Sequence, residues 1–82
     1  MKLYILTFEC VEDMEVYPII PQAYKTKESA VNALKMAYKR ASADYPEEYE
    51  RICSETECDI YEEGRYAENR WIGRVDEVDV ED

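Results

Sequence analysis

The stretch "TKESAVNALKMAYKRA", residues 26–41, decides the fold because it joins a helix start to a continuous apolar face. Thr26 suits the N-cap position, and Glu28 follows in the first turn, near the positive end of the helix dipole. Apolar side chains recur at the three- and four-residue intervals of one helical face, at Ala30, Val31, Leu34, Ala37, Tyr38 and Ala41. The pattern predicts a helix over residues 27–42 that packs one side against a sheet.

Two segments before this helix have the character of strands. Alternation in residues 2–11 places Tyr4, Leu6, Phe8 and Cys10 on one face, which we expect to be the core face. The next segment, "VYPIIP" at residues 16–21, contains two prolines, which cannot donate hydrogen bonds in a ladder. We therefore expect an antiparallel hairpin whose second strand lies at a sheet edge.

The segments after the helix predict a second short helix and two further strands. Pro46 suits the first position of a helix over about 46–53, with two glutamates following in its first turn. Residues 57–62 and 70–80 read as strands. In the last one, Val78 and Val80 are out of phase with Trp71 and Val75, so a bulge at residues 76–77 is expected to bring them to one face.

These elements predict one small α+β domain spanning residues 1–82. The expected fold is ββαββ-like, with an antiparallel sheet of about four strands. The main helix 27–42 and the short helix 46–53 are expected to lie on one face of that sheet. A chain of 82 residues is too short for two separate cores.

The expected compartment is the cytoplasm. No apolar run approaches the roughly 20 residues that span a bilayer, and the opening "MKLYILTFEC" lacks the apolar region of a signal peptide. Cys10, Cys53 and Cys58 make an odd count, which favours free thiols in a reducing compartment. The spacing of Cys53 and Cys58 also suits a small closed loop or two metal ligands, but without histidine a zinc site would need carboxylate ligands.

Residue types needed for common catalytic and cofactor sites are missing from the sequence. The chain has no histidine, which excludes Ser–His and Cys–His nucleophilic systems. Its only glycines, Gly64 and Gly73, cannot form a glycine-rich phosphate loop. The acidic segment beginning at Asp76 ends after seven residues, too few for a calcium-binding EF-hand loop. We therefore expect a non-enzymatic protein without cofactor or metal.

The negative charge is concentrated in one half of the chain. Net charge is −10; residues 1–42 carry five acidic and six basic residues, whereas residues 43–82 carry fifteen acidic and four basic ones. This balance disfavours nucleic acid and anionic membranes as direct partners. It favours a basic protein surface, although an acidic face that only confers solubility is the plain alternative.

Acidic side chains on one face of a strand repeat about every 6.6–6.8 Å, comparable with the spacing of phosphates along a nucleic-acid strand. Such an array would suit the basic surface of a nucleic-acid-binding protein, whose arginines could contact the carboxylates in bidentate fashion. The predicted interaction residues are Glu47, Glu48, Glu50, Glu55, Glu57, Asp59, Glu62, Glu63, Tyr66, Asp76, Glu77, Asp79 and Glu81. The alternative function is a self-associating accessory domain, with a homodimer formed by pairing exposed strand edges.

The layout "LYILTFEC…YKTKESAVNALKMAYK…RWIGRVDEVDV" resembles short β-hairpin–helix–β proteins of phages and mobile elements. Tyr24, Thr26, Lys27, Glu28 and Ala30 match the "[FY]xTKExA" helix start of that pattern. Acidic anti-CRISPR and anti-restriction inhibitors are similar in size and charge. The resemblance implies a phage-encoded inhibitor that binds a host defence nuclease and blocks its DNA channel.

Overall fold

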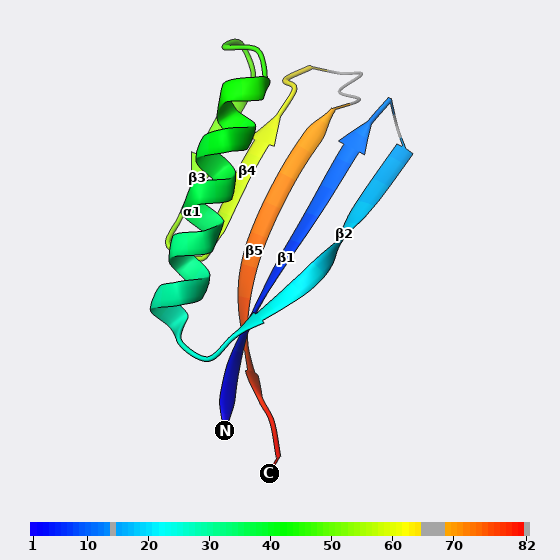
Figure 1. Cartoon of the computed structure of the whole chain (residues 1–82). Helices are drawn as coiled ribbons and strands as arrows, with labels where there is room; N and C mark the ends of the chain where they lie inside the picture. Colours follow the sequence, from blue (N-terminus) through cyan, green and yellow to red (C-terminus); the bar gives the residue numbers. More distant parts are fainter. Residues whose placement is uncertain (14, 65–68, 82) are drawn as a thin grey trace.

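The computed structural model describes residues 1–13, 15–64 and 69–81. Within them, five strands form one antiparallel sheet in the order β2-β1-β5-β4-β3, and one helix packs against a single face of it (Figure 1). The elements are β1 (Lys2–Glu12), β2 (Glu15–Tyr24), α1 (Lys27–Asp44), β3 (Glu50–Cys53), β4 (Glu57–Tyr61) and β5 (Arg70–Asp79). In the described part of the chain, the helix is not long and apolar enough to cross a membrane.

The predicted ββαββ arrangement, with about four strands and a second helix over 46–53, is wrong. The chain is mostly β, and its elements follow the order ββαβββ. The helix ends at Tyr45, whose backbone is extended. A turn follows, closed by a hydrogen bond from the Tyr49 N–H to the Pro46 carbonyl, and residues Glu50–Cys53 then pair with β4. A helix of one and a half turns is marginal by itself, and pairing with β4 satisfies the same backbone groups in a ladder.

The main helix follows its prediction and extends two residues beyond it. The Thr26 hydroxyl accepts a hydrogen bond from the Ser29 N–H at 3.2 Å, which caps the first turn of α1. Ala30 and Leu34 are fully buried against the sheet. The face identified from the apolar spacing is therefore the one that meets the core.

The core lies between α1 and the central strands. It consists of Leu6, Ala30, Leu34, Cys58, Ile60, Trp71 and Val75. The Trp71 ring packs 5.6 Å from Phe8 and 6.3 Å from Tyr38, measured between ring centroids. Gly73 lets the helix approach the sheet, because a Cβ atom there would lie 2.7 Å from Leu34 Cδ1.

The bulge predicted at Asp76–Glu77 does not form. β1 and β5 pair one to one from Lys2↔Asp79 to Val11↔Arg70 without interruption. Alternation then places Val78 on the opposite face from Val75, and Val78 is exposed. The uninterrupted hydrogen bonds between β1 and β5 stabilise the sheet more than the burial of Val78 and Val80 would.

The irregularity lies instead in the outer hairpin. The β1–β2 register shifts between Leu6 and Phe8, where Ile20 and Pro21 together oppose Thr7. β2 is an edge strand, as predicted from its prolines. Just before the start of β1, the Met1 amino group donates a hydrogen bond to the Val80 carbonyl, and the Val80 N–H donates to the Met1 carbonyl. The two ends of the chain therefore lie side by side (Figure 1).

Candidate interaction surface

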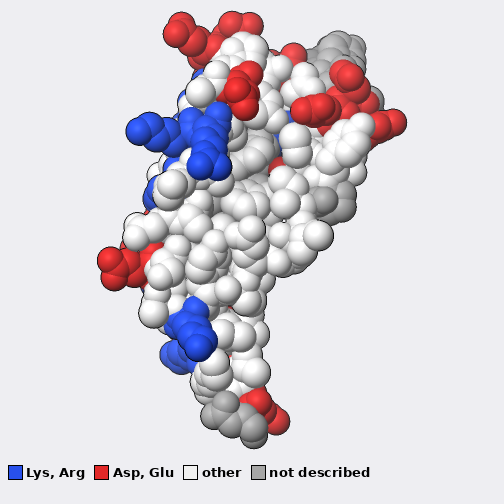
Figure 2. All heavy atoms as spheres, in the orientation of Figure 1, with Lys and Arg blue, Asp and Glu red and all other residues white. Residues whose placement is uncertain are grey.

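Three chain connections meet at the end of the sheet opposite the termini, and all three are acidic. β1, α1 and β4 run toward this end, while β2, β3 and β5 run away from it (Figure 1). We call it the acidic end. It comprises Glu12, Asp13, Glu15, Asp44, Glu47, Glu48, Glu50, Glu62 and Glu63. Figure 2 shows red carboxylate groups on both sides of this end of the molecule.

Asn69 joins the three connections. Its side-chain oxygen accepts a hydrogen bond from the Asp13 N–H at 3.4 Å. Its amide nitrogen donates to the Tyr49 hydroxyl and to a Glu62 carboxylate oxygen, both at 3.2 Å. Asp13 has a φ of 49°, a left-handed conformation that aspartate tolerates better than most residues. One amide thus holds together the turns that carry the acidic residues.

Arg51 shapes the connection between α1 and β3. Its guanidinium donates to the Ser42 hydroxyl at 2.7 Å, and to the carbonyls of Ser42 at 2.9 Å and Tyr49 at 2.8 Å. Further donations reach the carbonyls of Tyr45 and Pro46. These bonds satisfy carbonyls left free at the helix C-terminus and fix the turn that bears Glu47 and Glu48.

Three carboxylates toward the other end of the molecule have basic partners, whereas Asp79 and Glu81 have none among the described residues. Ion pairs join Lys2 to Glu77 at 3.4 Å, Lys27 to Glu55 at 2.6 Å, and Arg74 to Asp76 at 3.3 Å. The Lys27 ammonium lowers the pKa of Glu55 through a hydrogen bond and its charge. A bidentate ion pair between Arg70 and Asp59 lies next to the acidic end, because Arg70 begins β5 opposite Val11 and Tyr61, and the Asp59 carboxylate raises the pKa of Arg70.

Within the described residues, eight of the nine carboxylates of the acidic end lack such ion pairs. Among the described residues, no ion pair engages Glu12, Asp13, Glu15, Asp44, Glu47, Glu48, Glu50 or Glu63. Basic side chains do lie nearby on the outer surface of α1, where Lys39 and Arg40 are exposed. They adjoin the acidic end without pairing with it in the described structure.

The fold separates the predicted interaction residues into groups. It brings Glu47, Glu48, Glu50, Glu62 and Glu63 together at the acidic end. Asp76, Glu77, Asp79 and Glu81 lie toward the termini, in a molecule 46 Å long. Glu57 and Asp59 lie on the helix-free face of β4, Glu55 lies in the β3–β4 turn, and Tyr66 falls outside the described residues. One continuous acidic row, as predicted, does not form.

An uncharged surface adjoins the acidic end on the helix side of the sheet. Figure 2 shows it as a broad white area over the middle of the molecule. By register with Phe8 and Cys10, Ile19 and Tyr17 of β2 face this side, and both are about half exposed. Exposed tyrosines such as Tyr17 are common anchors in protein interfaces.

Two tyrosines next to the acidic end have raised pKa values. Burial, together with the Cys10 thiol 3.4 Å from its hydroxyl, raises the pKa of Tyr45. A hydrogen bond to the Glu15 carboxylate raises the pKa of Tyr17. The Tyr17 hydroxyl already donates to Glu15, and the Tyr45 hydroxyl is hydrogen-bonded to Cys10, so both side chains are held in place beside the acidic end.

Comparison of the chain with family models, curated proteins and solved structures finds no match.

An open hollow of about 580 Å³ adjoins the acidic end on the helix-free face of the sheet. It is lined by Val11, Ile52, Asp59, Tyr61, Glu62, Asn69 and Arg70. Among the described residues, no cluster of three histidine, cysteine, aspartate or glutamate side chains is arranged to hold a metal ion.

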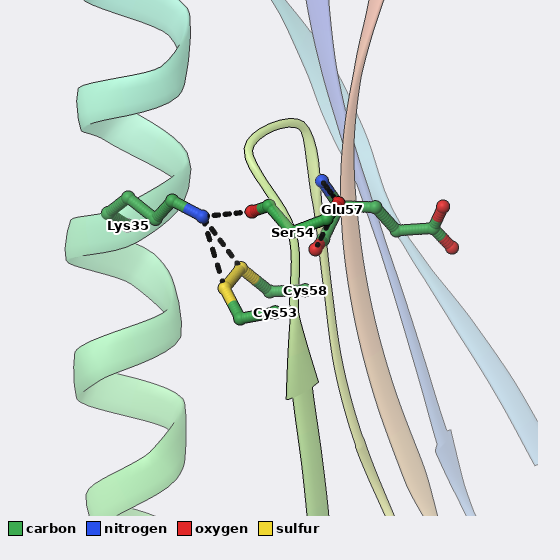
Figure 3. Close-up of a disulfide and its surroundings, with 5 residues drawn as sticks. All are labelled: Lys35, Cys53, Ser54, Glu57 and Cys58. Carbon is green, nitrogen blue, oxygen red and sulfur yellow. Dashed lines mark hydrogen bonds between the residues drawn. A yellow bond between two sulfur atoms is a disulfide. The ribbon is translucent and has the colours of Figure 1, made fainter.

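Cys53 and Cys58 form a disulfide (Figure 3), so the expectation of three free thiols is wrong. The two residues are direct partners across β3 and β4, with Cα atoms 4.1 Å apart. The prediction failed because it rested on the odd number of cysteines and an expected reducing compartment, whereas the pairing of β3 with β4 sets Cys53 directly opposite Cys58. Cys10 is the free cysteine.

The sequence reasoning missed four acidic residues of this surface, which are Glu12, Asp13, Glu15 and Asp44. Three of them lie in the half of the chain whose charge is nearly balanced. A signal was available, because consecutive antiparallel elements alternate in direction and their alternate connections share an end. Following the strand directions would have placed the connection of the predicted hairpin, with Glu12, Asp13 and Glu15, beside the glutamates that follow α1.

Proposed function

We propose that this chain is a non-catalytic acidic binding protein whose acidic end occupies the basic groove of a nucleic-acid-binding protein. The observation that carries the proposal is the convergence of carboxylates from three connections, where, Glu62 aside, none has an ion-pair partner among the described residues. Holding like charges together opposes folding, and a basic partner would relieve that repulsion.

The resemblance to small acidic proteins of phages and mobile elements narrows the partner class. It favours a host defence nuclease, such as a CRISPR effector, whose DNA-binding channel is lined by lysine and arginine. Carboxylates at the acidic end would take the place of phosphates and exclude the nucleic acid. The adjoining tyrosines would add apolar contact area to a mainly electrostatic interface.

Two variants with the same change in net charge test the proposal. The first carries Glu12→Gln, Asp13→Asn, Glu47→Gln and Glu48→Gln at the acidic end. The second carries Asp76→Asn, Glu77→Gln, Asp79→Asn and Glu81→Gln near the termini. Displacement of fluorescent duplex DNA from purified CRISPR effector nucleases is measured at about 50 and 200 mM salt.

We expect the unmodified chain to displace DNA from one of these nucleases, with an affinity that falls steeply as salt rises. The acidic-end variant should lose at least about tenfold in affinity, whereas the second variant should stay close to the original. An equal loss of affinity in both variants would show that binding depends on net charge alone and not on the acidic end. Failure of the unmodified chain to displace DNA from any tested nuclease would refute the proposal for this class.

Self-association is the second candidate, because β2 exposes apolar side chains, among them Ile20 with 84% of its surface accessible. Pairing of β2 edges is disfavoured, since Pro18 and Pro21 lack N–H groups and the register shift interrupts the strand. A dimer would therefore form through side chains. Sedimentation at high salt distinguishes it, because an apolar dimer persists where an electrostatic complex dissociates.

A further inference from the structure

The Cys53–Cys58 disulfide is asymmetric in its access to solvent. Cys53 lies on the edge strand β3 and is exposed, whereas Cys58 on β4 is completely buried within the core. We therefore expect an incoming thiolate to reach Cys53 more readily than Cys58. Attack on a disulfide depends on which sulfur is accessible, so the fold directs exchange to one position.

A positive charge is aimed at the same bond. Lys35 Nζ lies 3.2 Å from Cys53 Sγ and 3.7 Å from Cys58 Sγ, and it also donates to the Ser54 carbonyl (Figure 3). Among the described residues, no ion pair joins Lys35 to a carboxylate. The electrostatic attraction between this ammonium and a neutral disulfide is weak, whereas a thiolate formed by reduction would form an ion pair with it.

We propose that Cys53 is a thiol-exchange site, which takes a low-molecular-weight thiol of the glutathione class as a reversible mixed disulfide. The external thiolate attacks Cys53 Sγ, a new S–S bond forms, and the Cys53–Cys58 bond breaks. The electron pair of that bond leaves with Cys58 as a thiolate, which the Lys35 ammonium stabilises. A second external thiolate can then release Cys53, giving a protein dithiol and the oxidised external disulfide.

The first test treats the oxidised full chain with about 10 mM reduced glutathione, quenches with acid, and maps adducts by mass spectrometry. A glutamate-specific protease cleaves after Glu55 and Glu57 and so separates Cys53 from Cys58. We expect the adduct on Cys53, with Cys58 appearing as a free thiol. An adduct on Cys58, equal adducts on both residues, or a disulfide that resists reduction would overturn the proposal.

The role of the ammonium is tested with Lys35→Gln, with Lys39→Gln on the exposed side of the same helix as the matched control. Loss of the charge should destabilise the leaving Cys58 thiolate and slow reduction about threefold. Lys35→Arg, which keeps the charge, should retain most of the rate. Equal reduction rates for Lys35→Gln and Lys39→Gln would show that the Lys35 ammonium does not stabilise the leaving thiolate.

A measurement that leaves Lys35 untouched uses single-cysteine replacements and oxidised glutathione. Cys58→Ala leaves Cys53 as a thiol and should form the adduct, whereas Cys53→Ala leaves only the buried Cys58 of the pair and should resist. Faster labelling of Cys58 than of Cys53, with both variants folded by circular dichroism, would contradict directed exchange.

Discussion

Asn69 shows how one side chain can decide the arrangement of a charged surface. It accepts from the turn at Asp13 and donates to Tyr49 and Glu62, which belong to the two other connections at the acidic end. Asparagine suits this role because its amide is donor and acceptor without charge. A carboxylate in the same place would add to the repulsion that the amide offsets.

We therefore expect Asn69→Asp to destabilise the fold. The change keeps the size of the side chain, removes both donors, and sets a carboxylate beside Glu62. The free energy of unfolding should fall by about 1–3 kcal/mol, read by urea denaturation with Trp71 fluorescence. Asn32→Asp, at an exposed position of α1, is the control and should change stability by less than about 0.5 kcal/mol. Equal losses in both variants would show that Asn69 does not organise the acidic end.

At the scale of elements, β3 depends on partners that are distant in the sequence. It is an edge strand of four residues that pairs with β4 and is tied to the end of α1 through Arg51. The fork of a guanidinium reaches several carbonyls at once, which a lysine ammonium at the same position would not do.

Arg51→Lys should loosen β3 and the turn before it while charge is kept. Loss of several hydrogen bonds from a charged donor should lower the free energy of unfolding by about 1.5–3 kcal/mol. Amide hydrogen exchange should quicken in Glu50–Cys53 and in the last turn of α1, with little change in β1. Arg40→Lys, at an exposed position of α1, is the matched control. Unchanged exchange in β3 would contradict this anchoring role.

Elements that are stabilised mainly by their own residues could be predicted from the sequence, whereas elements that depend on distant partners could not. The helix over residues 27–42 was visible because Ala30 and Leu34 lie on a face of strict helical spacing. Pro46, Glu47 and Glu48 form a good helix start, yet the segment forms a turn and a strand because β4 and Arg51 are available to it. Local preference could not reveal either partner.

The acidic end was only partly predictable for a similar reason. The glutamates after α1 were identified from the excess charge of the second half, but that count drew attention away from Asp13 and its neighbours in the first. It also grouped Asp79 and Glu81 with residues at the opposite end of the sheet. Charge along the chain becomes charge in space only once the direction of each strand is known.

At the scale of the whole molecule, the uneven compensation of charge predicts a stability that depends on salt. Raising sodium chloride from about 10 to 300 mM shortens the Debye length from about 30 Å to below 10 Å and screens the carboxylates of the acidic end from one another. Tm should rise by roughly 4–8 °C, as expected for a gain of about 1 kcal/mol in a domain of this size.

The two four-residue variants described for the binding test extend this prediction. At low salt, neutralising the acidic end should raise Tm, because it relieves repulsion. Neutralising residues 76–81 at the four named positions should leave Tm unchanged or lower it, because Asp76 and Glu77 lose their ion pairs. Differential scanning fluorimetry at both salt concentrations checks the signs, and equal rises in Tm would refute the asymmetry.

The pairing of β1 with β5 also determines how the molecule would respond to mechanical force. The two strands run antiparallel, with Lys2 opposite Asp79 at the end where the termini meet. A load applied to these two residues acts along the inter-strand hydrogen bonds, so the bonds open one at a time from that end. The central ladder should therefore unzip at low force in an optical trap, although it joins the two longest-paired strands of the sheet.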